Sequence, residues 1–291
     1  MIKKISTNRD DYHKNVVKTW SDNVYKKYVN SPWRWADLPF RDYVTKGNFF
    51  HKEYLNQNVS IKIEGKSILE IGSAMGCAYK FMKNSNLIDL SEYTGVEVSK
   101  VGYDYCVKNY PEANWLHKDF TKIPKLDNVN YCFERNAIHH MPDPLKAYKK
   151  ILLATNTAFS TCFRSCLNGA TFSDLNLSNF KSSTGIYYCS VINLFDVIRL
   201  GLENDFYSMK ITYGGKHEYI SNDPNHVHFM DKNINQNEIF LSRCKVYMIK
   251  TGIQKQPTFN FVARPDVVIK NLNAIYLIQK QLKKIKKEYS N

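Results

Sequence analysis

The stretch that decides the fold is residues 67–77, which read SILEIGSAMGC. Its first half is the short apolar run of a strand buried on both faces. Gly72 and Gly76 then let the backbone turn sharply and approach a ligand closely. Residues 78–83 read as a helix, so the turn would present free N–H groups at a helix start. This combination is typical of a nucleotide-binding loop, although similar turns also occur where nothing binds.

Further short strands follow, and an acidic residue stands at the end of the next two. Residues 93–98 are expected to form the second strand, with Glu97 where a βαβ unit places the carboxylate that binds a ribose. Residues 115–120 form a third short run that contains Asp119. A fourth lies in residues 131–144 and is followed by a helix. Alternating strands and helices predict a parallel sheet with helices on both faces.

The order and spacing of these four motifs, over about residues 66–160, resemble the class I S-adenosylmethionine-dependent methyltransferases. The likeness is to the small-molecule branch, that of the quinone-biosynthesis and type 11-like methyltransferases. It implies an α/β, Rossmann-like sheet, mostly parallel with an antiparallel last strand, and S-adenosyl-L-methionine as cofactor. The loop reads acid-x-Gly-x-Ala-x-Gly and lacks the final spacing of the dinucleotide fingerprint, which argues against NAD.

The resemblance also implies roles for single positions. The loop over residues 70–76 would surround the methionine part of the cofactor, and Glu97 would accept from both ribose hydroxyls. Asp119 would accept from the adenine amino group, with Phe120 beside the base. The implied cofactor-binding residues are Glu70, Gly72, Ser73, Ala74, Gly76, Glu97, Val98, Asp119, Phe120, Asn136 and Ala137.

Ala74 departs from the family pattern, which usually has glycine at this position. An L-residue with a side chain is tolerated in such a loop only where its φ is negative. We therefore expect a negative φ at Ala74.

Composition places the chain among ordinary soluble proteins. Of its 291 residues, 43% are hydrophobic and 23% charged. No window approaches the roughly 18 consecutive apolar residues of a membrane span, and the start lacks the apolar region of a signal peptide. Seven cysteines without CxxC spacing indicate reduced, buried thiols rather than disulfides or zinc. A cytoplasmic protein is expected.

The net charge of +14, from 41 basic and 27 acidic residues, is compatible with a phosphate-bearing partner. The excess is spread along the chain, and no RNA-binding module is visible. A basic enzyme surface is therefore favoured over binding to nucleic acid.

Three regions are predicted. Residues 1–55, rich in aromatic side chains, are interpreted as a helical lid whose rings either line an acceptor pocket or pack on the sheet. Residues 56–252 form the Rossmann-like core, with inserted loops at about 163–190 and 216–238 that would wall the acceptor site. Residues 253–291 end in a basic amphipathic helix.

In the second half of the core, residues 157–250, we predict three strands and one helix. They are a fifth strand at 157–162, a helix at 193–202, a strand at 208–213 ended by a Gly214-Gly215 turn, and a final strand at 239–250.

The C-terminal helix is expected to begin near Pro265 and Asp266. Its apolar stripe comprises Val268, Leu272, Ile275, Leu282 and Ile285, with Ile278 beside it and five lysines opposite. Such a helix could pair with a second copy of the chain, lie on an anionic membrane surface or pack on its own core.

The candidate catalytic residues are histidines, which suit proton removal near neutral pH. His139 and His140 follow the fourth strand, where each is interpreted as either a general base or a packing residue. His226 lies in the second predicted loop, beside His217 and His228. His226 and His228 with Asp223 and Asp231 could hold a divalent metal, but alternating loop residues are a poor guide to ligation, so no metal is expected.

The function predicted from these features is methylation of a small molecule, by O-methylation of a sugar or another secondary metabolite. The alternatives are an RNA or protein methyltransferase, or a non-catalytic binding protein of the same fold. Against RNA, the fourth strand lacks the Asn/Asp-Pro-Pro-aromatic motif of amino-group base methylation.

Overall fold

A computed structural model describes residues 67–84, 92–182, 185–216, 228–230, 241–250, 252, 256–263 and 272–290. The predicted lid at 1–55, the metal candidates Asp223 and Asp231, and His217 and His226 lie outside these residues. The chain divides into two compact units, Met1–Ile123 and Pro124–Asn291. No helix within the described part of the chain is long and apolar enough to cross a membrane.

The first unit contains a parallel sheet in the order β1-β2-β3. Its elements are β1 (Ile68–Ile71), α5 (Cys77–Asn84), β2 (Tyr93–Glu97), α6 (Lys100–Asn109), β3 (Asn114–His117) and the 3-10 helix η2 (Phe120–Lys122). All four residues of β1 are buried, as the apolar run predicted. The three predicted strands and the helix after the first are thereby confirmed.

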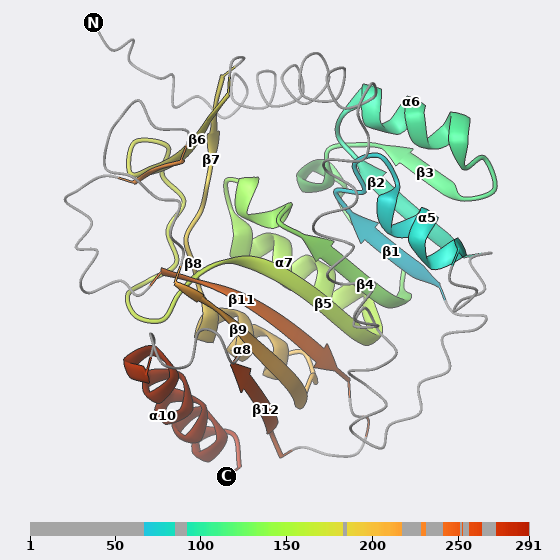
Figure 1. Cartoon of the computed structure of the whole chain (residues 1–291). Helices are drawn as coiled ribbons and strands as arrows, with labels where there is room; N and C mark the ends of the chain where they lie inside the picture. The colour runs from blue at the N-terminus through green and yellow to red at the C-terminus, as the bar shows by residue number, and fades with distance from the viewer. Residues whose placement is uncertain are drawn as a thin grey trace, which may run out of the picture. The chain divides into compact units, whose positions relative to one another are not determined.

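Helix α6 lies along β2 and β3 (Figure 1). Ser99 caps its start, where the hydroxyl accepts from the Gly102 N–H at 3.3 Å. Gly102 also lets the helix approach the loop after β1, because a Cβ there would lie 2.7 Å from the Ala74 carbonyl oxygen. The loop and the helix are therefore packed together at the carboxyl end of β1.

The second unit is built on a sheet in the order β12-β9-β11-β5-β4, with β8 paired to β5. Its strands are β4 (Val129–Arg135), β5 (Thr155–Cys166), β8 (Ile192–Asn193), β9 (Ser208–Lys216), β11 (Leu241–Ile249) and β12 (Thr258–Ala263). β4 runs parallel to β5, and β11 runs antiparallel to both β5 and β9. The mostly parallel sheet with an antiparallel strand is confirmed.

That antiparallel strand is not the last one, contrary to the prediction. β12 follows it and pairs in parallel with β9, inside the segment 253–291 for which the sequence indicated a helix alone. β12 reads TFNFVA and alternates between exposed and half-buried residues, with Phe259 and Phe261 on its half-buried side. This is a period-2 strand pattern that the prediction of a helix alone overlooked.

The predicted turn at Gly214 and Gly215 is also wrong, because β9 continues through both residues to Lys216. The register against β11 shifts between Ser242 and Cys244, so the two glycines face a single residue. This is a β-bulge, where the freedom of glycine serves the backbone without ending the strand.

The two predicted loops contain a second, three-stranded sheet instead. β6 (Ser178–Ser182) and β7 (Gly185–Tyr188) form an antiparallel hairpin, and β10 (His228–Met230) pairs with β6. Figure 1 shows the β6–β7 hairpin standing away from β5 and β11. Sequence patterns missed this sheet because its strands are short and β10 joins from a distant part of the chain.

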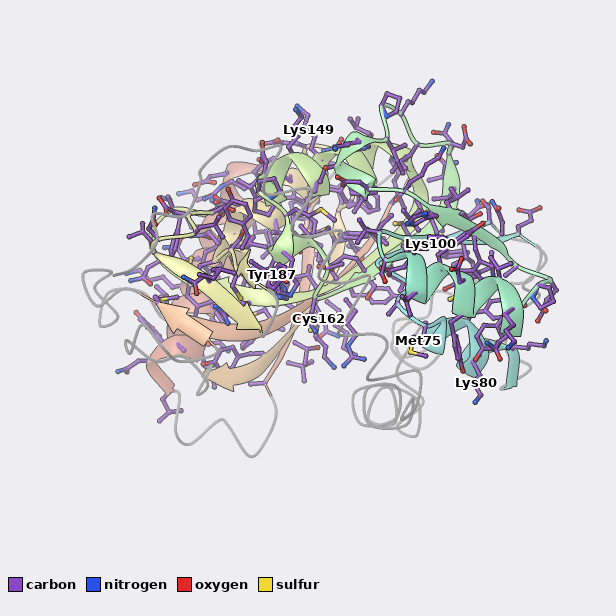
Figure 2. The ribbon with its side chains drawn as sticks, turned by 90° about the horizontal axis from the view of Figure 1, so that it is seen from above. Met75, Lys80, Lys100, Lys149, Cys162 and Tyr187 are labelled. Atoms are coloured by element: carbon purple, nitrogen blue, oxygen red, sulfur yellow. The ribbon has the colours of Figure 1, made fainter. Side chains whose placement is uncertain are left out.

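Helices of the second unit bury one face each. The 3-10 helix η3 (Ile138–His140) precedes α7 (Pro144–Ala154), which is capped by Asp143 and buries Tyr148 among others while Lys149 points outward (Figure 2). α8 (Leu194–Leu202) confirms the helix predicted at 193–202. The Asn193 side chain caps its start.

The C-terminal helix α10 (Leu272–Glu288) packs against β12. Its buried side chains are Ala274, Ile278, Leu282 and Ile285. Leu272, placed in the apolar stripe by the sequence, is 60% exposed. The structure therefore shows α10 packed on its own chain. Pairing with a second copy and contact with a membrane stay predictions.

Candidate functional site

The loop after β1 is built from residues in the left-handed region. Gly72, Ala74 and Gly76 have φ values of 73°, 52° and 67°. The expectation of a negative φ at Ala74 is therefore wrong. The N–H groups of Gly72 and Ser73 donate to the Val96 carbonyl at 2.9 and 3.1 Å, which ties the loop to β2. The strain at Ala74 is held in place by these contacts and by a hydrogen bond of its own N–H.

That N–H donates to Glu97 Oε2 at 2.6 Å, and the Ser99 N–H donates to Glu97 Oε1 at 2.8 Å. Glu97 is the last residue of β2 and only 4% exposed. Removal of the carboxylate from water raises the pKa of Glu97 to about 7, and its backbone hydrogen bonds oppose that rise. The side chain thus joins the loop after β1 to the start of α6.

Two other predicted positions of this unit have structural partners of their own. Glu70 lies within β1, is 5% exposed and accepts from the Tyr93 hydroxyl. Ser73 is 2% exposed, and its hydroxyl has no hydrogen-bond partner within the described residues. Glu70 is therefore held in the sheet rather than in the loop.

Asp119 follows β3 and caps η2. Its Oδ1 accepts from the Thr121 N–H at 2.9 Å and from the Thr121 hydroxyl at 2.7 Å. Phe120 is buried, with 4% exposure. Glu97 pairs in register with His117 on β3, so Glu97 and Asp119 stand at the carboxyl ends of adjacent strands. Val98, partly exposed, offers its carbonyl to His117 Nε2 at 3.2 Å.

The remaining predicted residues belong to the second unit, at the end of β4. Asn136 is exposed with a φ of 53°, and its N–H donates to the Cys162 carbonyl at 3.0 Å. The next two N–H groups, of Ala137 and Ile138, donate to the Glu134 carboxylate at 2.9 and 3.3 Å. Sequence reasoning missed Glu134, whose only signal was an acid at the end of an apolar strand.

Glu134 is 2% exposed and also accepts from the hydroxyls of Tyr148 and Thr161. Burial raises the pKa of Glu134. The carboxylate fixes the turn that carries the two neighbouring histidines.

His139 is 8% exposed and its ring centroid lies 4.1 Å from that of His140. His140 Nδ1 lies 2.8 Å from the Tyr188 carbonyl oxygen. Loss of hydration lowers the pKa of His140 to about 4, so its ring is neutral at pH 7. Such a ring is a weak base, which reduces the case for His140 as the proton acceptor. His226 lies outside the described residues.

Two further side chains join the histidines, and no local pattern had indicated them. Arg164 on β5 is 4% exposed, and its guanidinium donates to the Cys189 sulfur and lies 3.4 Å from the Ser178 hydroxyl. Burial raises the pKa of the Cys189 thiol, against the influence of Arg164. These residues are about 25 to 50 positions from the histidines, so only folding brings them together.

Comparisons with known proteins bear on the fold. No family model and no curated protein matches the chain. Among solved structures, it is similar to the O-methyltransferase of a trans-AT PKS multienzyme of Brevibacillus brevis, determined with S-adenosyl-L-homocysteine. The two are 13% identical with a TM-score of 0.50, over 86% of this chain and 91% of that one.

It is also similar to an S-adenosylmethionine-dependent methyltransferase from Clostridium acetobutylicum, with 10% identity and a TM-score of 0.48, over 79% of this chain and 100% of that one. The likeness to the Brevibacillus enzyme shows that the chain shares the Rossmann-like α/β fold of that structure.

Proposed function

We propose that this protein is an S-adenosylmethionine-dependent methyltransferase that acts on a small molecule, by O-methylation of a sugar or another secondary metabolite. The observation that carries the proposal is Glu97, a buried carboxylate at the carboxyl end of β2 that is bonded to the loop after β1. In open α/β sheets, ligands bind beyond the carboxyl ends of the strands.

The cofactor would lie against the first unit. Glu97 accepts only from backbone N–H groups within the described residues, of Ala74, Ser99 and Val98. A carboxylate offers about four acceptor sites, so capacity for a ribose hydroxyl is left. Asp119, one strand further along the sheet, stands where the resemblance places the acceptor for the adenine amino group.

The bound cofactor would supply an activated methyl group on a sulfonium. The protein would then need to hold the acceptor in line with that methyl group, exclude water and allow the acceptor proton to leave. His139, His140 and His226 stay the candidate bases, and the low pKa of His140 makes it a weak base for an alcohol, whose proton is firmly held.

The test is calorimetric titration with S-adenosylmethionine and, separately, with S-adenosylhomocysteine, followed by methyl-transfer assays on three acceptor sets: small molecules (sugars and phenolic metabolites), RNA and peptides. We expect both cofactor forms to bind in the micromolar range and at least one hydroxyl acceptor to be methylated. Glu97→Ala should weaken the binding of both forms, and its matched control is Asp104→Asn, because Asp104 is an exposed acid on α6 that pairs with Lys100.

Each negative result has its own meaning. If neither form binds the wild-type protein, the proposal is wrong. If both bind and no acceptor in the small-molecule, RNA and peptide sets gains a methyl group, the non-catalytic alternative is favoured.

A further inference from the structure

Three metal-binding side chains converge in the second unit, in a place the sequence did not indicate. His139, His140 and Cys189 each offer one donor atom, and these atoms all lie within 4.8 Å of one another. Imidazole nitrogen and thiolate sulfur are ligands that Zn²⁺ prefers in proteins. His139 and Cys189 are buried and His140 is partly exposed.

Two contacts with the backbone beside Cys189, one from the His139 carbonyl and one from the His140 ring, fix the histidines against the cysteine. The Ser190 N–H donates to the His139 carbonyl at 2.8 Å, and His140 Nδ1 lies 2.8 Å from the Tyr188 carbonyl oxygen. Ser190 and Tyr188 are the two chain neighbours of Cys189. The segment that carries the thiol is therefore tied to η3 on both sides of the ligand, so the donor atoms are placed by folding itself.

The orientation of His140 is that of a metal-binding histidine. A carbonyl oxygen can only accept a hydrogen bond, so Nδ1 carries the proton in the contact with Tyr188. The lone pair is then on Nε2. Histidines that bind metals commonly donate their other ring N–H to a carbonyl or carboxylate in this way, which fixes both tautomer and ring direction.

Cys189 is held from its other side as well. The Ser178 hydroxyl donates to the Cys189 carbonyl at 2.7 Å. The guanidinium of Arg164 donates to the Cys189 sulfur. A metal binds the thiolate form of cysteine.

We propose that His139, His140 and Cys189 bind a transition-metal ion of the zinc type, with at least one coordination position left for another ligand. The guanidinium of Arg164 adds positive charge beside the ion. A carboxylate or a deprotonated hydroxyl would therefore suit the open position better than a neutral group. The proposal concerns the chain's own residues and does not depend on methyltransferase activity.

The test is titration of the purified chain with Co²⁺, which reports its ligands by absorption, with Zn²⁺ as competitor. We expect about one ion per chain, a near-ultraviolet sulfur-to-cobalt band, and loss of the spectrum when Zn²⁺ is added. Cys189→Ser should abolish the band. His140→Gln should weaken Co²⁺ binding more than about tenfold.

Cys162→Ser is the matched control, because Cys162 is a partly exposed thiol on β5 that is not part of the cluster. It should leave the spectrum unchanged. Circular dichroism verifies that each variant is folded, and His140→Gln tests the site if Cys189→Ser does not fold. No band in the folded wild-type protein, or a band that survives Cys189→Ser, would overturn the proposal whether or not S-adenosylmethionine binds.

Discussion

Two buried glutamates perform similar tasks in the two units, and their contacts differ. Glu97 at the end of β2 accepts from the N–H groups of Ala74 and Ser99. Glu134 near the end of β4 accepts from the N–H groups of Ala137 and Ile138. Each carboxylate therefore fixes the turn that follows a strand, and burial raises the pKa of both.

The difference lies in what else each carboxylate binds. Glu134 also accepts from the hydroxyls of Tyr148 and Thr161, which brings it to the roughly four bonds a carboxylate can accept. Glu97 accepts from no side chain within the described residues. A saturated carboxylate suits a purely structural role, whereas one bonded only to backbone retains capacity for a ligand.

The largest effect is expected for the stability of Glu134→Ala. The substitution removes the acceptor of the Ala137 and Ile138 N–H groups and leaves the hydroxyls of Tyr148 and Thr161 bonded only to each other, and should lower the free energy of unfolding by about 3–5 kcal/mol. Urea unfolding measures the change. A loss below about 1 kcal/mol would show that the network does not support the turn.

Glu97→Ala should act mainly on the cofactor. We expect its affinity for S-adenosylmethionine to fall about 10-fold to 100-fold, because a hydrogen bond from the ribose to a charged acceptor is lost. Calorimetry measures the affinity, with Asp104→Asn as the control that should bind like wild type. Equal affinities for Glu97→Ala and wild type would refute the ribose role.

The pKa of about 7 for Glu97 predicts a pH dependence of binding. Ribose hydroxyls donate to the ionised carboxylate, so bound cofactor favours deprotonation and affinity should rise with pH. Between about pH 6 and pH 8 the rise should be about tenfold, since the ionised fraction grows by that factor. Glu97→Gln keeps all other titrating groups of the protein, and the cofactor itself titrates in the same way with both proteins. The affinity of this variant should therefore not show this rise with pH. A parallel slope in both proteins would contradict the assignment.

The raised pKa of Glu97 should also make the stability of the cofactor-free protein fall as pH rises, whereas cofactor affinity increases. The folded pKa lies above the unfolded value of 4.5, so the free protein binds more protons than the unfolded chain between about pH 4.5 and 7. Its unfolding free energy should therefore decrease over that range relative to Glu97→Gln. Unfolding curves at several pH values, without cofactor, measure this difference, and equal slopes would show that Glu97 does not titrate in that window.

The smallest effect concerns Ala74. A left-handed φ costs an L-residue about 1–2 kcal/mol, and glycine loses about 0.5–1 kcal/mol more backbone entropy on folding. Ala74→Gly should therefore stabilise the chain by about 0.5 kcal/mol without changing cofactor affinity, while Ala74→Val should destabilise it. A loss of stability in Ala74→Gly would show that the alanine methyl group contributes packing that outweighs the strain.

The sequence predicted the regular part of the fold because its signals are local. The apolar run of β1 and the acid that ends β2 each act within a few residues. The φ of Ala74 was mispredicted because the contacts that hold it come from β2, more than 20 residues away. The cluster around Cys189 could not be found for the same reason, since its partners meet only through tertiary hydrogen bonds.

The small sheet of β10, β6 and β7 implies an order of events during folding. The β6–β7 hairpin closes a short loop and can form as soon as residue 188 has left the ribosome. β10 belongs to a segment that is synthesised about 40 residues later, after β9, so its pairing with β6 must close a long loop. The third strand should therefore join late, and until then β6 exposes an unpaired edge to which another nascent chain could add a strand.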